Sequence, residues 1–146
     1  MNFDDPDMRD KAKVKKIKID QSEMMKKYGW FAHYVPNDED SPTGFNAHTH
    51  GFEDSWGHPD VQIVVGMPQA QLHGILIVMA NLLKKGETFE PGRKYEEILQ
   101  GYPVTFAWAK EGSRRLLRMI LPDKDGGVMR DEIQAPYSIQ WNGTEV

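Results

Sequence analysis

Histidine is the residue type whose spacing in this chain could do chemistry. His48 and His50 are separated by one residue, so in a β-strand both side chains would lie on the same face, about 7 Å apart along the backbone. His58 or Asp60 could supply a third ligand and water a fourth, as in the open three-ligand arrangement of hydrolytic zinc. His33 is a further candidate ligand. This spacing is compatible with a site for Zn²⁺ or another divalent metal.

A plainer interpretation competes with the metal site. Two histidines at alternate positions often occur by chance, and their imidazoles can simply face solvent. In that case His58 would be a structural residue whose ring bonds the backbone of its own loop. We favour this plainer interpretation from the sequence alone.

The tetrapeptide Gly57-His58-Pro59-Asp60 has two interpretations of its own. Proline disfavours helix for the residue before it, so His58 should be extended. His58 and Asp60 could then form a hydrogen-bonded acid/base pair and, with Thr49 and Trp56, line a ligand-binding site. Alternatively, Asp60 accepts backbone N–H bonds and His58 braces the loop, which is the interpretation we favour.

Two clusters of basic residues add further candidates. Arg114, Arg115 and Arg118 could receive an anion such as phosphate if their strand face is concave, although a solvated strand face is the simpler account. The lysines of residues 11–19 could contact nucleic acid or an acidic protein. Acidic residues in the preceding segment would partly neutralise them, which favours a solvated arm.

Composition restricts the class of protein. With 146 residues, 39% of them hydrophobic, the chain fits one domain over residues 20–146 that follows a charged N-terminal arm over residues 1–19. It has no cysteine, so any metal site must use His, Asp or Glu. A net charge of -4 argues against general nucleic-acid binding. With no apolar run of about 18 residues and no basic, apolar leader, we expect a cytoplasmic protein without membrane contact.

Hydrophobic patterning predicts the elements that would position these residues. Residues 21–28 are expected to form a short helix, and residues 30–35 and 45–52 a pair of strands. A central strand over residues 61–65, buried on both faces, precedes a long helix that begins at Pro68 and ends near Gly86. Residues 102–109 and 114–121 predict a β-hairpin. Residues 95–99 suggest one helical turn, residues 53–59 a loop, and residues 137–141 a last strand.

These elements show no regular alternation of strand and helix. We therefore expect an α+β fold in which a mostly antiparallel sheet of about five to six strands packs against one long helix, with a short N-terminal helix. Four tryptophans and eight methionines are more than one modest core obviously needs, which makes a homodimer a reasonable expectation.

Several short motifs occur in an order typical of one family. They are Gly29-Trp30, Thr49-x-Gly51-Phe52, Gly57-His58-Pro59-Asp60, Gly66-Met67-Pro68 and Pro122-Asp123-Lys124-Asp125-Gly126. Over residues 22–127 the chain resembles the bacterial domain of unknown function 4262 family. The resemblance implies a small bacterial or phage protein and assigns no reaction.

The chain departs from this pattern at positions that matter for function. His48 and His50 stand where the family commonly has an aromatic residue and a valine, Leu121 replaces a tryptophan, and residues 128–131 replace a proline-tryptophan pair. The histidines therefore look particular to this chain, whereas the loop at residues 57–60 follows the family.

Three hypotheses follow. The first is a non-catalytic binding or regulatory module, with immunity or anti-defence roles included, that engages a protein or small molecule around Trp56, His58 and the long helix. The second is a metal-dependent hydrolase that uses His48, His50 and His58 or Asp60. The third is a nucleic-acid accessory protein that uses the lysine arm. The first is favoured because no complete catalytic constellation is visible, and whether the protein is an enzyme stays open.

Overall fold

The computed structural model describes residues 21–36 and 45–145 as an α+β fold built on one six-stranded sheet. Neighbouring strands are antiparallel except for the parallel pair β3 and β6. The strands, in their order across the sheet, are β1 (Phe31–Pro36), β2 (Phe45–His50), β3 (Val61–Met67), β6 (Arg114–Ile120), β5 (Tyr102–Glu111) and β4 (Tyr95–Leu99). The predicted fold class is confirmed. The arm predicted over residues 1–19 lies outside the described residues.

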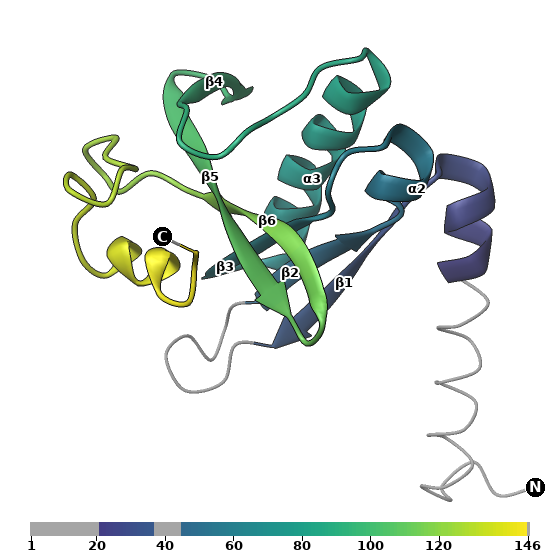
Figure 1. The fold of residues 1–146 in the computed structure, drawn as a ribbon, viewed down its shortest axis with the longest axis horizontal. Coiled ribbons are helices and arrows are strands. Elements are labelled where there is room, and N and C mark those ends of the chain that lie inside the picture. The colour runs from purple at the N-terminus through teal and green to yellow at the C-terminus, as the bar shows by residue number, and fades with distance from the viewer. Residues whose placement is uncertain (1–20, 37–44, 146) are drawn as a thin grey trace, which may run out of the picture.

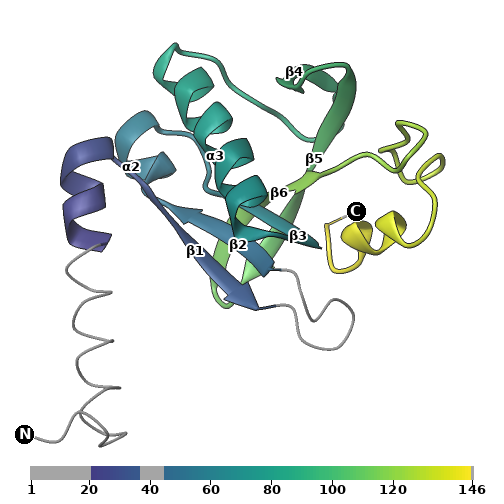
Figure 2. The ribbon, with the colours of Figure 1, turned by 180° about the vertical axis from the view of Figure 1, so that it is seen from behind.

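The long helix α3 (Gln69–Lys84) covers one face of the sheet, as Figure 1 and the reverse view in Figure 2 show. Its buried side chains recur at helical spacing, as predicted, and pack on Ala47, Ile63 and Leu117 of the sheet. These buried helix residues are Leu72, Leu76, Met79, Ala80 and Leu83. Because successive strand residues point to opposite faces, the neighbours of Ala47 on β2 must face away from α3.

The predicted hairpin is confirmed as β5 and β6. Seven residue pairs align from Thr105 and Ile120 to Glu111 and Arg114. The connection is only two residues, Gly112 and Ser113, and Gly112 has a φ of 60°, which suits a tight hairpin turn. The hairpin therefore ends on an acidic and a basic side chain directly opposite each other.

The expected strand over residues 45–52 is two residues too long. β2 ends at His50, and the helix α2 (Phe52–Trp56) occupies part of what was predicted as a loop. Gly51 causes the break, because its φ of 105° is open to glycine and a Cβ there would lie 2.5 Å from the Gly29 carbonyl oxygen. Gly29 has its own reason, because its φ is 83° and a Cβ there would lie 2.7 Å from Ser55 Oγ. A helix of residues 21–28 precedes Gly29, as predicted.

Residues 95–99 form the edge strand β4 and not the predicted helical turn. Tyr95 aligns with Val104 and Leu99 with Tyr102, so the segment bonds to the neighbouring β5. Gly101, with a φ of 83°, permits the two-residue turn between the strands.

The last predicted strand, over residues 137–141, is also wrong. It is the 3-10 helix η1 (Tyr137–Trp141), whose buried Gln140 satisfies the backbone beyond β6 with its side-chain amide. The Leu121 N–H donates to Gln140 Oε1 at 2.7 Å, and Gln140 Nε2 donates to the Leu121 carbonyl at 2.9 Å. The Gln140 side chain therefore makes the hydrogen bonds to Leu121 that a neighbouring strand would have made.

β3 is central, as predicted, but it is not buried on both faces. Val61 and Ile63 are buried toward α3, whereas Gln62 and Val64 are half-buried. The second face of the sheet is therefore accessible enough to carry a site. Within residues 21–36 and 45–145, the helices are too short or too polar to cross a membrane.

Candidate functional site

Three histidines gather on the sheet face opposite α3. β1 and β2 align His33 with His48, and His50 follows two residues later on the same face. One ring nitrogen from each lies within 4.8 Å of the others. The ring centroids of His33 and His48, and those of His48 and His50, are 4.9 Å apart. We call His33, His48 and His50 the histidine cluster. Of the five predicted metal candidates, the cluster contains His33, His48 and His50 but neither His58 nor Asp60.

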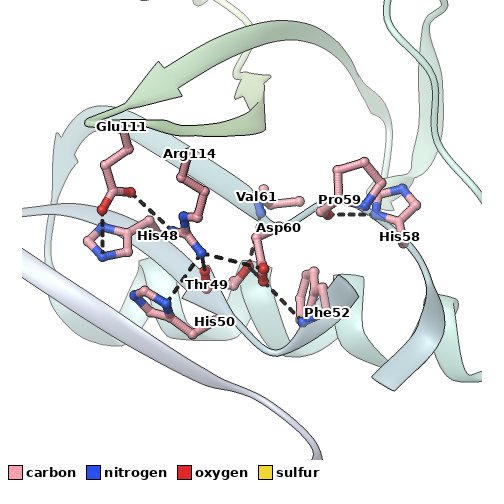
Figure 3. Close-up of polar contacts among 10 residues, drawn as sticks. All are labelled: His48, Thr49, His50, Phe52, His58, Pro59, Asp60, Val61, Glu111 and Arg114. Atoms are coloured by element: carbon pink, nitrogen blue, oxygen red, sulfur yellow. Dashed lines mark hydrogen bonds and ion pairs between the residues drawn. The ribbon is translucent and has the colours of Figure 1, made fainter. Parts of the chain in front are cut away.

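The hairpin tip adds a charged pair to the cluster (Figure 3). Glu111 Oε1, at the end of β5, lies 3.4 Å from His48 Nε2. Its other oxygen, Oε2, accepts from the Arg114 guanidinium at 3.2 Å. Arg114 also lies 3.3 Å from His50 Nδ1. Two strands that are distant in sequence from β1 and β2 therefore complete the surroundings of the cluster.

Burial keeps two of the cluster's imidazoles neutral. It lowers the pKa of His48 to about 4, against an opposing effect of Glu111. Burial, and then the positive charge of Arg114, lower the pKa of His50 below its usual range. The His48 side chain is only 11% exposed, while His33 is exposed. Near pH 7 both rings are neutral, which is the form that binds metal ions.

Asp60 lies close to the histidine cluster, and its carboxylate accepts hydrogen bonds that hold neighbouring segments together. The Thr49 hydroxyl donates to Asp60 Oδ1 at 2.7 Å and accepts the Val61 N–H at 2.9 Å. The Phe52 N–H donates to the same Oδ1 at 3.0 Å, and Arg114 lies 3.5 Å from Oδ2. Asp60 and Thr49 are buried, at 7% and 0% exposed. Together they join the end of β2, the start of α2 and the start of β3.

His58 lies apart from the cluster and has both ring nitrogens occupied. Nδ1 lies 2.8 Å from the Pro59 carbonyl, and the Phe89 N–H donates to Nε2 at 3.2 Å. Since a carbonyl only accepts and an N–H only donates, the ring is the neutral tautomer that carries its proton on Nδ1. Burial lowers the pKa of His58 accordingly. The geometry is that of a brace between the loop and the chain before β4.

The remaining candidates do not converge on one point. Arg115 pairs with Glu145 at 2.7 Å and stacks on the Trp108 ring, while Arg118 is buried and donates to Gln62 and to carbonyl oxygens near the C-terminus. The three predicted anion-binding arginines thus have different partners, and only Arg114 lies at the cluster. Trp56 packs against Phe52, with ring centroids 5.5 Å apart, at the edge of the core.

Sequence reasoning missed Glu111, which carries the only carboxylate placed against His48 among the described ion pairs. A signal was present in the hairpin. Glu111 and Arg114 flank its two-residue turn, so their side chains had to share a face. What the sequence did not reveal is that this face meets β2.

Comparison with known proteins places the chain in a family. No curated protein and no solved structure matched the sequence. A family model matches residues 24–118, which include most of the helix before Gly29, every residue of the histidine cluster, and most of the hairpin. That is well over half of the chain, and it agrees with the resemblance carried by the ordered motifs. The chain belongs to the family described as Domain of unknown function (DUF4262).

Proposed function

We propose that this protein is a metal-binding module in which His33, His48 and His50 hold a divalent transition metal ion such as Zn²⁺. The observation that carries the proposal is the approach of three imidazole nitrogens to within 4.8 Å of one another on one sheet face. Ligand atoms of tetrahedral zinc, each about 2.0–2.1 Å from the metal, lie about 3.4 Å apart. A small rotation of the exposed His33 ring and of the two neighbouring rings would bring the three nitrogens from within 4.8 Å to this spacing.

The surroundings of the histidine cluster support this assignment. The neutral state of His48 and His50 supplies the lone pairs that a metal requires. Glu111 beside His48 is a carboxylate partner of the kind that orients metal-binding histidines. Three protein ligands leave one position for water or another ligand.

Binding is a better account than hydrolysis. A metal hydrolase needs a general base near the bound water, and the two carboxylates beside the cluster are Glu111 and Asp60. Arg114 contacts both of them, and Asp60 also accepts from Thr49 and Phe52. This agrees with the non-catalytic module favoured from the sequence. The nucleic-acid alternative rests on lysines outside the described residues.

The test is metal analysis of protein purified without a histidine tag. We expect one equivalent of Zn²⁺ or Co²⁺ to bind the wild type, and a His48→Ala/His50→Ala double variant to lose at least about a hundredfold in affinity, because even partners of ligands cost 10–100-fold. His73→Gln is the matched control, since His73 is an exposed histidine on α3. Failure of the wild type to bind Zn²⁺, Co²⁺ or Ni²⁺, or equal binding by the double variant, would refute the proposal.

A further inference from the structure

Among the arginines of residues 21–36 and 45–145, Arg114 alone lies at the histidine cluster, and its guanidinium is shared among several acceptors. Arg114 Nη1 lies 3.0 Å from the Thr49 carbonyl, 3.3 Å from His50 Nδ1 and 3.5 Å from Asp60 Oδ2. A guanidinium Nη1 carries only two hydrogens, so it cannot serve three acceptors well. The contacts to His50 and Asp60 are long for charge-assisted bonds. One N–H donor of Arg114 therefore lacks a strong hydrogen-bond acceptor.

The contact with His50 determines which ring nitrogen carries the proton. Because a guanidinium only donates, His50 Nδ1 must accept, and the proton of the neutral ring lies on Nε2. A metal needs a lone pair on His50. It either takes Nδ1 directly or takes Nε2 after the proton has moved to Nδ1. In both cases the Arg114 N–H loses its acceptor on His50.

The charges of the metal-bound site would then favour an anion. A divalent ion on neutral imidazoles contributes two positive charges and Arg114 contributes one, while Glu111 and Asp60 contribute two negative charges. One net positive charge remains, next to a freed N–H donor and an open metal position. Arg114 is partly exposed, with 30% of its side chain accessible, so a ligand from solvent can reach it.

We infer that the fourth ligand of the metal is a small oxyanion, a carboxylate or a phosphate, that is held jointly by the metal and by Arg114. One oxygen binds the metal and another accepts from the guanidinium, whose fork matches such groups. The inference rests on the proposed metal site and names the class of ligand that this site recognises. Arg115 and Arg118 take no part, because their guanidinium groups have other partners.

The experiment uses the full chain loaded with Co²⁺, whose visible absorption reports changes in its ligands. Acetate and inorganic phosphate are titrated separately into the wild type, Arg114→Gln and Arg115→Gln in a non-coordinating buffer. We expect at least one anion to change the wild-type spectrum and Arg114→Gln to bind it about tenfold more weakly, as for loss of one charge-assisted contact. Arg115→Gln removes the same charge from the same strand and should behave as the wild type.

The same variant should move Co²⁺ affinity in the opposite direction. Removing the positive charge beside His50 lessens its repulsion of the metal, so Arg114→Gln should bind Co²⁺ several-fold more tightly. A variant that is merely misfolded would weaken both. If Arg114→Gln does not fold, Arg114→Lys replaces it: it keeps the charge, loses the fork, and should bind the anion about threefold more weakly.

Three outcomes overturn the inference in distinguishable ways. A wild type that takes up no Co²⁺ refutes the proposed metal site itself. Normal Co²⁺ uptake with no spectral response to either anion refutes only the oxyanion. An anion response of equal strength in the wild type and in the folded Arg114 variant refutes the role of Arg114.

Discussion

Two histidine-bearing regions lie close together in the sequence and differ in how their ring nitrogens are used. In the loop before β3, His58 bonds the Pro59 carbonyl through one nitrogen and the Phe89 N–H through the other. In the histidine cluster, three rings gather on one sheet face, and the contacts of their nitrogens within the described part of the chain are with side chains. A backbone partner is fixed by the fold, whereas a side chain can move away. The loop is therefore architecture, and the cluster is available for a ligand.

The comparison also separates what the family motifs do from what this chain adds. The Thr49 hydroxyl, the Asp60 carboxylate and Gly51 all lie in motifs that carry the family resemblance, and all join backbone segments. His48 and His50 depart from that resemblance and belong to the candidate site. A family model can thus identify the scaffold correctly while it says nothing about a site built on one face of it.

The largest expected effect comes from breaking the loop region at Asp60. In Asp60→Ala the Thr49 hydroxyl, the Phe52 N–H and the Arg114 guanidinium all lose an acceptor. We expect the free energy of unfolding to fall by about 3 kcal/mol, as for a buried charge pair that loses one partner. Urea denaturation followed by circular dichroism measures it. Asp54→Ala, an exposed acid on α2, is the control, and an equal effect of both variants would contradict the assignment.

A smaller loss should follow when only the Thr49 hydroxyl is removed. Thr49→Val keeps the shape of the side chain but leaves the buried Val61 N–H without its acceptor and Asp60 without one donor. Stability should fall by about 2 kcal/mol, the usual range for buried polar groups left unpaired. Thr49→Ser restores the hydroxyl and should recover most of the loss in the same denaturation experiment. If the serine variant is as unstable as the valine variant, the methyl group and not the hydroxyl is what matters.

Much of the fold could be predicted because its signals are local. The apolar spacing of α3 and the turn residues of the β5–β6 hairpin are both read within a few residues. The predictions for residues 95–99 and 137–141, which form β4 and η1, were wrong for a different reason. Each depends on a partner from elsewhere in the chain, β5 for Tyr95–Leu99 and the backbone of Leu121 for Gln140. A single sequence does not show those partners.

The candidate site follows the same rule. The spacing of His48 and His50 was visible, and β1 brings His33 opposite them as the neighbouring strand. His58 was grouped with them because it is near in sequence, but Gly51 and α2 turn the chain away before it. Asp60 returns beside the cluster, where its carboxylate is occupied by Thr49 and Phe52. Glu111 and Arg114 were distant in sequence and come close through the pairing of β6 with β3. Long-range register, which no local pattern encodes, determines this half of the site.

The pH dependence of protein stability can distinguish the contribution of the loop at His58 from that of the histidine cluster. Burial lowers the pKa of His58, so below about pH 6.5 the unfolded chain binds a proton that the folded chain does not. The stabilising contribution is present above that pH and is lost as the pH falls, by up to about 1.4 kcal/mol per pH unit. Burial lowers the pKa of His48 and His50 as well, so the wild type should lose stability steeply as the pH falls from about 6.5 to about 4.

His58→Gln isolates the contribution of the loop. The variant should be less stable at pH 7 because two backbone bonds are disturbed, yet its stability should depend less steeply on pH. The slope of the wild type, measured in the same buffers, is the reference. An unchanged slope in His58→Gln would mean that His58 titrates alike in the folded and unfolded chains, which contradicts a buried brace between Pro59 and Phe89.

The smallest expected effect tests whether Glu111 belongs to the histidine cluster or only to the hairpin. Glu111→Gln keeps the size of the side chain and removes the negative charge beside His48. If Glu111 orients His48 and offsets the charge of the metal, Zn²⁺ affinity measured by competition with a chelating dye should fall about tenfold, the lower end for a partner of a metal ligand. Glu96→Gln on β4 removes the same charge from an exposed position and should have no effect. Unchanged affinity in Glu111→Gln would mean that the Glu111 carboxylate pairs functionally with Arg114 alone and serves the turn between β5 and β6. The metal site would then consist of the three imidazoles without Glu111.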